Sequence, residues 1–169
     1  MSLLGKKLLS LLNNPKKRKK SQEIPSYDKA EKIGILYTYG DEKKEETIQL
    51  LRELIDDRIK TEVLCFSEKK EVVQTDHPTF SIEHLNSWGK VNSPEAEQFI
   101  NTPFDFLIHL DFDLNEIMKN MLIHTKAKCR VGFHSENGLE FYELMIGMNK
   151  SAGTSNFAEQ TIKYIKAIR

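Results

Sequence analysis

"KIGILYTYGDEKKEETIQLLRELIDDRIKTEVLCF", residues 32–66, decides the fold because it combines a strand, a helix and a second strand. An apolar, β-rich run at 32–39 ends at Gly40, and another apolar run follows at 61–66. Between them, residues 41–58 predict a helix, because apolar side chains recur there at helical spacing. The inward stripe of this helix consists of Ile48, Leu51, Leu54 and Ile55. A strand, a helix and a strand in this order predict two parallel strands joined by a crossover helix.

The alternation of strands and helices continues to the C-terminus. Further strands are predicted near 78–82 and at 104–111, 128–134 and 139–147, and further helices at 93–101, 114–125 and 155–169. Ser93 is expected to cap the first of these helices. The strand runs are almost continuously apolar, as in strands that are buried on both faces. The sequence therefore predicts an α/β fold, a Rossmann-like three-layer sandwich with a mainly parallel sheet, over residues 30–169. Residues 1–29 are predicted to form a basic amphipathic helical arm and a linker.

Charge is divided unevenly along the chain. The formal net charge is zero, from 25 Lys and Arg against 25 Asp and Glu. Residues 1–20 hold seven bases and no acid, which leaves 18 bases against 25 acids in the rest of the chain. A basic end on an acidic body is typical of an arm that binds an anionic partner.

The first residues of the arm predict a short amphipathic helix, because leucines gather on one side and lysines on the other. The apolar side contains Leu4, Leu8, Leu11 and Leu12, and the polar side contains Lys6 and Lys7. A helix this short needs a surface to pack on, whether its own domain, a partner or a lipid. "PKKRKK", residues 15–20, follows it and opens a polar linker without helical or strand periodicity.

The turn after the first predicted strand, "YTYGDEKKEE" at 37–46, is the place where such folds usually bind a nucleotide phosphate. It has one glycine and neither of the glycine-rich phosphate-binding fingerprints. Asp41, Glu42, Glu45 and Glu46 suit the positive end of the helix dipole, and they would repel a phosphate. The sequence therefore predicts no conventional nucleotide site.

"FDFLIHLDFDLN", residues 104–115, has two interpretations. His109 and Asp111 lie at the end of a predicted central strand, where open α/β sheets bind ligands, and they could carry out acid–base chemistry. A pocket there would also include Tyr39 and His134, which follow other strands. Alternatively, Asp111 or Asp113 caps the next helix and His109 is a satisfied, partly buried histidine. We favour the capping interpretation, because caps are common where a strand runs into a helix.

Other residue types give little sign of chemistry. Cys65 and Cys129 stand far apart in apolar runs, which predicts two buried thiols in a reducing compartment. The five histidines show no metal-ligand spacing, and no apolar run approaches the roughly 20 residues of a membrane span. We therefore expect a cytoplasmic protein with no cofactor and no metal site.

The cationic run is the strongest surface signal, because five consecutive charged side chains must meet water or an anion. We expect a non-enzymatic binding or scaffold protein that docks through its arm on RNA, the ribosome included, or on a membrane surface. An acidic protein partner stays open. The residues expected to bind the partner are Lys6, Lys7, Lys16, Lys17, Arg18, Lys19, Lys20, Leu4, Leu8, Leu11 and Leu12. The alternative is an enzyme, or a degenerate glycosyltransferase-like domain, that binds a small polar substrate at the strand ends.

Two resemblances accompany this interpretation. "A-x-x-I-G-I-L" at Ala30–Leu36 and "PFDFLIHLD…KAKCRVGFH…LEFYELMIG" within 103–147 resemble a family of small bacterial proteins of unknown function. The second stretch is also similar to the N-terminal half of heptosyltransferase-like (GT-B) glycosyltransferases. Those enzymes work in the cleft between two Rossmann-like domains, and this sequence has room for one. The second resemblance thus implies an α/β domain that could keep an acceptor-type pocket without completing a transfer.

Overall fold

The computed structural model describes residues 13, 23–40, 42–69, 75–84, 86 and 91–169. Within these ranges the chain forms one sheet of six strands, all parallel, in the order β3-β2-β1-β4-β5-β6. The strands are β1 Lys32–Thr38, β2 Lys60–Ser67, β3 Thr79–Ser81, β4 Phe106–His109, β5 Cys129–Phe133 and β6 Leu144–Ile146. The predicted fold class, a Rossmann-like α/β sandwich, is therefore confirmed.

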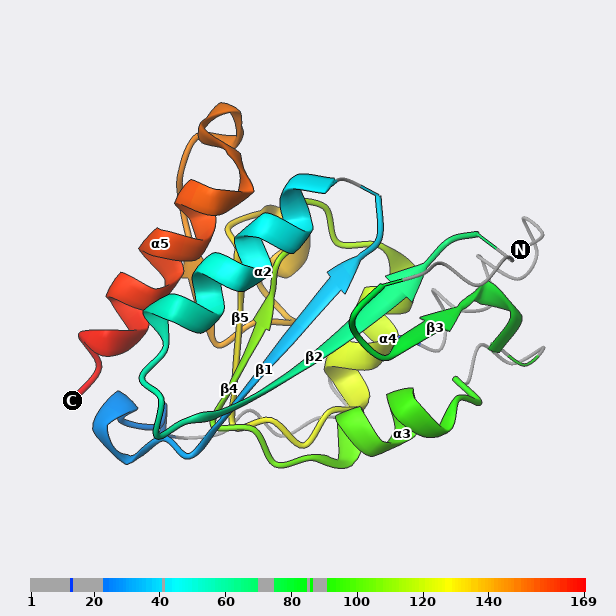
Figure 1. The fold of residues 1–169 in the computed structure, drawn as a ribbon, viewed down its shortest axis with the longest axis horizontal. Coiled ribbons are helices and arrows are strands. Elements are labelled where there is room, and N and C mark those ends of the chain that lie inside the picture. Colours follow the sequence, from blue (N-terminus) through cyan, green and yellow to red (C-terminus); the bar gives the residue numbers. More distant parts are fainter. Residues whose placement is uncertain (1–12, 14–22, 41, 70–74, 85, 87–90) are drawn as a thin grey trace.

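Helices cover both faces of the sheet. They are α2 Glu42–Leu54, α3 Pro94–Asn101, α4 Glu116–His124 and α5 Gly153–Lys166. Helices α2 and α5 lie side by side on one face, and α3 and α4 lie on the other (Figure 1). Short 3-10 helices lie at Tyr27–Lys29, Ile82–His84, Glu136–Gly138 and Lys150–Ala152. The result is the expected arrangement of three layers.

Each face of the sheet has its own apolar core, because successive side chains of a strand point to opposite faces. Ile33 and Ile35 of β1 belong to the core beneath α2 and α5, together with Phe157 of α5. Leu36 of β1 belongs to the other core, together with Phe99 of α3. Strands buried on both faces explain why their sequences are almost continuously apolar.

Two helix starts test the capping predictions. The Ser93 side chain accepts a hydrogen bond from the Ala96 N–H, which confirms the predicted start of α3. The predicted cap of α4 by Asp111 or Asp113 is wrong. Asn115 caps this helix, since its Oδ1 accepts hydrogen bonds from the N–H groups of the second and third helical residues, at 3.0 and 2.9 Å. An amide oxygen serves as well as a carboxylate at this position, and Asp111 is left for another role.

The last predicted strand is shorter than expected. Of residues 139–147, Leu144–Ile146 form β6, while Phe141 and Tyr142 lie in a turn and pack into the core beneath α3 and α4. The apolar content of this segment predicted a strand, but two of its aromatic side chains serve the core from a turn. Tyr142 becomes important at the sheet end described below.

Strand order fixes the position of a ligand crevice. The chain extends the sheet from β1 to β2 and β3 on one side, and then returns to place β4 on the other side of β1. Open α/β sheets bind their ligands at such a reversal, outside the carboxyl ends of the two strands. In this chain those ends are Thr38 of β1 and His109 of β4.

The predicted arm falls outside the described residues except for Asn13. Along the predicted linker, Tyr27 is buried and its N–H donates a hydrogen bond to the Ile168 carbonyl, so the end of this segment packs on α5. Among the described residues, no helix has both the length and the apolar character needed to cross a bilayer.

Candidate functional site

A side chain of the protein itself occupies the position between the ends of β1 and β4, where such folds bind a ligand. Asp111, two residues beyond β4, reaches across to the end of β1. Its Oδ2 accepts hydrogen bonds from the Thr38 N–H at 2.9 Å and from the Thr38 hydroxyl at 2.6 Å. The Asp111 side chain is only 7% exposed. A buried carboxylate therefore joins the two central strands at the place where such folds receive a ligand.

Lys44 of α2 completes this contact. Its ammonium donates to Asp111 Oδ1 at 2.5 Å and to the Thr38 carbonyl at 2.7 Å. The Lys44 side chain is 16% exposed, so water screens this ion pair less than it screens a surface pair. The Lys44 ammonium thus connects α2 to the end of β1 and to Asp111, which follows β4.

His109 and Tyr142 extend the network below the surface. Both are buried, and Tyr142 Oη lies 2.7 Å from His109 Nδ1. His109 Nε2 lies 3.3 Å from Asp111 Oδ2, without a well-directed hydrogen bond. An ionised carboxylate can only accept, which favours a proton on Nε2 and leaves Nδ1 to accept from the Tyr142 hydroxyl. The ring therefore links the core of the sheet to the carboxylate.

The electrostatics of the cluster keep Asp111 charged. Burial opposes its ionisation, but His109 and the Lys44 ammonium outweigh burial and lower the pKa of Asp111 to about 2. Burial also raises the pKa of Tyr142, and the nearby Asp111 charge raises it further. At neutral pH the cluster thus contains an anionic Asp111 and a neutral Tyr142.

This arrangement supplies an internal anion. A phosphate at this position would accept hydrogen bonds from backbone N–H groups at the end of β1 and from a neighbouring cation. Here the Asp111 carboxylate accepts both the Thr38 N–H and the Lys44 ammonium. A phosphate would therefore have to displace a bound carboxylate and overcome its repulsion.

Two features of the "K-C-R-V-G" stretch hold the network in place. A Cβ on Gly132 would lie 2.3 Å from the Tyr142 ring, so only glycine lets this ring lie against β5. Arg130 is buried and donates to both carboxylate oxygens of Glu143, at 2.7 and 3.0 Å. Glu143 follows Tyr142 directly, so this ion pair fixes the turn that carries the tyrosine.

The structure brings together only part of the predicted pocket. His109 and Asp111 are neighbours, but both are buried, so a substrate could not reach them without rearrangement. Tyr39 is exposed, and its N–H donates a hydrogen bond to the Phe66 carbonyl. His134 is exposed, and its N–H donates to the Ile146 carbonyl. These two side chains lie beyond the strand ends rather than in the buried cluster.

Sequence reasoning missed Thr38, Lys44 and Tyr142. Thr38 carried no motif, and Lys44 stands among other charged residues at the start of a surface helix. Tyr142 lies 33 residues from His109 in the sequence. A partial signal was the glycine at position 132, since a glycine inside a strand often marks a close approach.

Asn13 connects the arm to the body. Its side-chain amide donates to the Glu116 carbonyl at 2.7 Å and to the Glu116 carboxylate at 3.0 Å, and its oxygen accepts from Asn120 at 3.0 Å. Asn13 is 7% exposed. The cationic run predicted to bind a partner begins three residues later, at Lys16, and lies outside the described residues together with the other predicted contact residues of the arm.

The described residues contain neither a cluster of metal ligands nor an accessible thiol. No group of three or more His, Cys, Asp or Glu lies close enough there to hold a metal ion. Cys65 and Cys129 are both buried and are not joined by a disulfide, and burial raises the pKa of the Cys65 thiol.

Comparison with known proteins places the chain in a family. No curated protein matches it, and no solved structure matches it. The likeness to the N-terminal half of heptosyltransferase-like enzymes therefore stays a prediction. A family model described as a family of unknown function (DUF6913) matches residues 2–168. Because the match spans almost the whole sequence, arm and α/β body together, the chain belongs to family DUF6913.

Proposed function

We propose that the protein is a non-enzymatic binding protein that docks on RNA, the ribosome included, through its basic N-terminal arm. The observation that carries this proposal is the division of charge, with seven bases and no acid in residues 1–20 and an excess of seven acids in the rest. Lysine and arginine bind phosphates without regard to base sequence. The acidic body repels RNA, so contact is directed to the arm.

The geometry of the sheet end supports a binding role rather than a catalytic one. The crevice that would receive a small ligand contains the Asp111 carboxylate, which Thr38 and Lys44 hold in place. The histidine beside it is buried. Breaking a buried ion pair is costly, because it leaves an unpaired charge. A substrate would thus have to break the contact that joins the central strands.

The Asn13 contacts support RNA over a lipid surface. An amphipathic helix bound to a membrane lies flat in the interface, with its leucines among the acyl chains. Residue 13 directly follows the predicted leucine helix and is hydrogen-bonded to α4. A helix tied to the body at its end has less freedom to lie in a bilayer, whereas lysine side chains can reach phosphates from such an anchor.

The test replaces the five consecutive cations of the arm by glutamine and measures binding to a fluorescent single-stranded RNA. The arm variant should lose binding while its unfolding transition stays unchanged. A matched variant with five exposed body cations replaced should bind as the unmodified protein does. The arm variant changes Lys16, Lys17, Arg18, Lys19 and Lys20, and the body variant changes Lys69, Lys126, Lys150, Lys163 and Lys166.

Equal RNA binding by the arm variant and the unmodified protein would show that the arm does not hold RNA. Anionic phospholipid vesicles are the second probe. If the unmodified protein co-sediments with vesicles and fails to bind RNA, the arm is a membrane anchor and the RNA proposal is wrong.

A further inference from the structure

The outer edge of β2 is open over half its length. Strand β3 pairs only with Cys65–Ser67, and no strand of the described part of the chain lies beside Lys60–Leu64 on that side. The Lys60 N–H points inward and donates to the Glu31 carbonyl, while the Cys65 N–H points outward and donates to the Pro78 carbonyl. Because backbone groups alternate along a strand, Thr61 and Val63 direct their N–H and C=O groups away from β1.

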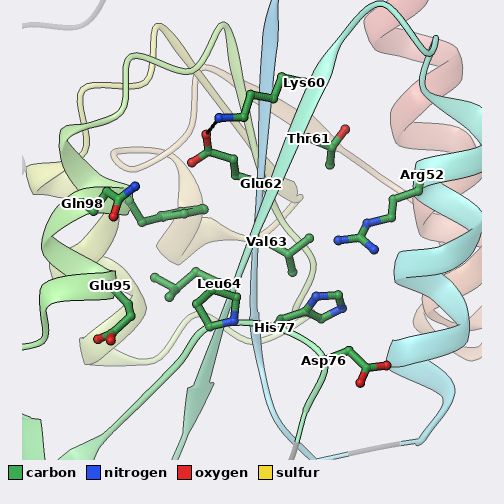
Figure 2. Close-up of a pocket in the computed structure, with 12 residues that line it drawn as sticks. Arg52, Lys60, Thr61, Glu62, Val63, Leu64, Asp76, His77, Glu95 and Gln98 are labelled. Carbon is green, nitrogen blue, oxygen red and sulfur yellow. Dashed lines mark ion pairs between the residues drawn. The ribbon is translucent and has the colours of Figure 1, made fainter.

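A groove follows this edge. It has a volume of about 360 Å³, with residues 60–64 of β2 as its floor. Arg52 of α2 lines one side, and Glu95, Gln98 and Phe99 of α3 line the other. Figure 2 shows Glu62 directed toward α3, and Val63 directed toward Arg52 and His77. The groove therefore has two chemically different walls above a row of outward-pointing backbone groups.

One end of the groove is fixed. Residues 76–78 cross it, and His77 Nε2 lies 3.3 Å from the Glu45 carboxylate of α2. The Tyr37 hydroxyl donates a hydrogen bond to the same carboxylate. His77 is thus held by Glu45 of α2, and its ring lies edge-on to the Tyr37 ring of β1, so an entering chain meets a fixed end.

We propose that this groove accepts an extended segment of a partner protein, which adds to the sheet as a strand beside Lys60–Leu64. Main-chain hydrogen bonds to an exposed sheet edge are an established way to bind a peptide. A second copy of the chain does not suit the groove. Helix α3 lines one side of it, so a second copy would have to bring its own α3 against the same edge.

Charge defines the chemistry of the segment. Side chains of an added strand alternate between the two walls. Those facing α3 would meet Glu62 and Glu95, and a hydrogen bond from the Ser93 hydroxyl lowers the pKa of Glu95, which keeps it ionised at neutral pH. Those facing α2 would meet Val63 and the Arg52 guanidinium (Figure 2), so an apolar residue suits this wall and a second cation does not. A segment in which lysine or arginine alternates with apolar residues fits both walls. Its cation would join Lys60 at Glu62, because the Lys60 ammonium forms an ion pair with the Glu62 carboxylate at 2.9 Å.

The direct test uses a short end-blocked peptide in which lysine alternates with valine, and measures backbone amide exchange in the full chain. The Thr61 and Val63 amides should exchange roughly tenfold more slowly in the presence of the peptide. A peptide of the same composition, with its lysines and valines in separate blocks, should leave them unchanged. Absence of peptide binding, or protection elsewhere on the body alone, would overturn the proposal.

Two variants separate strand addition from adhesion to the surface. Val63→Pro removes one outward N–H and leaves the pairing of β1 with β2 intact, since that N–H points away from β1. Gln98→Trp fills the groove from an exposed position of α3 without any change in the β2 backbone. Both should abolish peptide binding, and Glu62→Gln should weaken it several-fold.

Unchanged peptide binding by a folded Val63→Pro or Gln98→Trp variant would refute strand addition. If the Val63→Pro variant does not fold, peptide binding by the Gln98→Trp variant alone tests strand addition. A concentration-dependent dimer that Gln98→Trp abolishes would show that the groove takes a second copy, which would refute the proposed occupant. None of these measurements involves the arm, so this proposal and the RNA proposal can fail independently.

Discussion

Replacing Asp111 by asparagine tests whether its carboxylate joins the central strands. The variant keeps the shape of the side chain and removes the charge that Lys44 and Thr38 contact. Folding lowers the pKa of Asp111 from 3.8 to about 2. This difference corresponds to about 2 kcal/mol of stability at neutral pH. Because the side chain is only 7% exposed, water does little to reduce this value.

The sign of the pH dependence follows from the lowered pKa. The folded state favours the carboxylate, so its contribution is complete above the ordinary pKa and disappears as the pH falls through about 2. Asparagine does not titrate. The stability difference between the two proteins should therefore be about 2 kcal/mol at pH 7 and fall to about half of that near pH 3.

Urea unfolding, followed by far-ultraviolet circular dichroism at both pH values, measures this difference. Asp113→Asn is the matched control, because the Asp113 side chain is 93% exposed and pairs only with Lys150 among the described residues. An exposed pair of this kind contributes about 0–1 kcal/mol. If Asp111→Asn is no more destabilising than the control, or if its effect does not change with pH, the carboxylate does not hold the strands together.

Three further predictions concern packing and capping, each measured by urea unfolding. Gly132→Ala should destabilise the fold by about 1–3 kcal/mol, because the new Cβ meets the Tyr142 ring, and a neutral result would mean that the ring is free to shift. Arg130→Met should be destabilising by about 3–5 kcal/mol, and adding Glu143→Leu should recover much of this loss; a double variant as unstable as the single one would contradict the buried-pair argument. Asn115→Ala should be destabilising by about 1 kcal/mol, and an equal effect of Asp113→Ala would contradict the observed cap.

The sequence predicted the sandwich because its strands are buried on both faces and their apolar runs cannot be confused with surface segments. Ser93 was identified as a cap because the signal is local, with a proline and acids directly after it. Asp111 was misassigned for the same reason. Its partners, Thr38 and Lys44, are 73 and 67 residues away in the sequence, and local reasoning offered a nearby helix instead.

For the buried cluster at the sheet end, the sequence indicated two neighbouring residues but not their partners. Strand ends could be placed from the pattern, so His109 and Asp111 were correctly expected to lie near each other. The complete burial of His109 could not be predicted, because its partner Tyr142 comes from a segment that the pattern assigned to a strand. The open edge of β2 was also unpredictable, since it depends on how few residues of β3 pair.

The salt dependence of RNA binding tests the central claim most directly. If the five cations at residues 16–20 each contact a phosphate of single-stranded RNA, the logarithm of the affinity should fall with the logarithm of salt concentration at a slope of about 3.5. A fourfold rise in salt would then weaken binding roughly a hundredfold. An affinity that does not respond to salt, or a slope that stays the same when these residues are glutamine, would contradict an arm that binds phosphates.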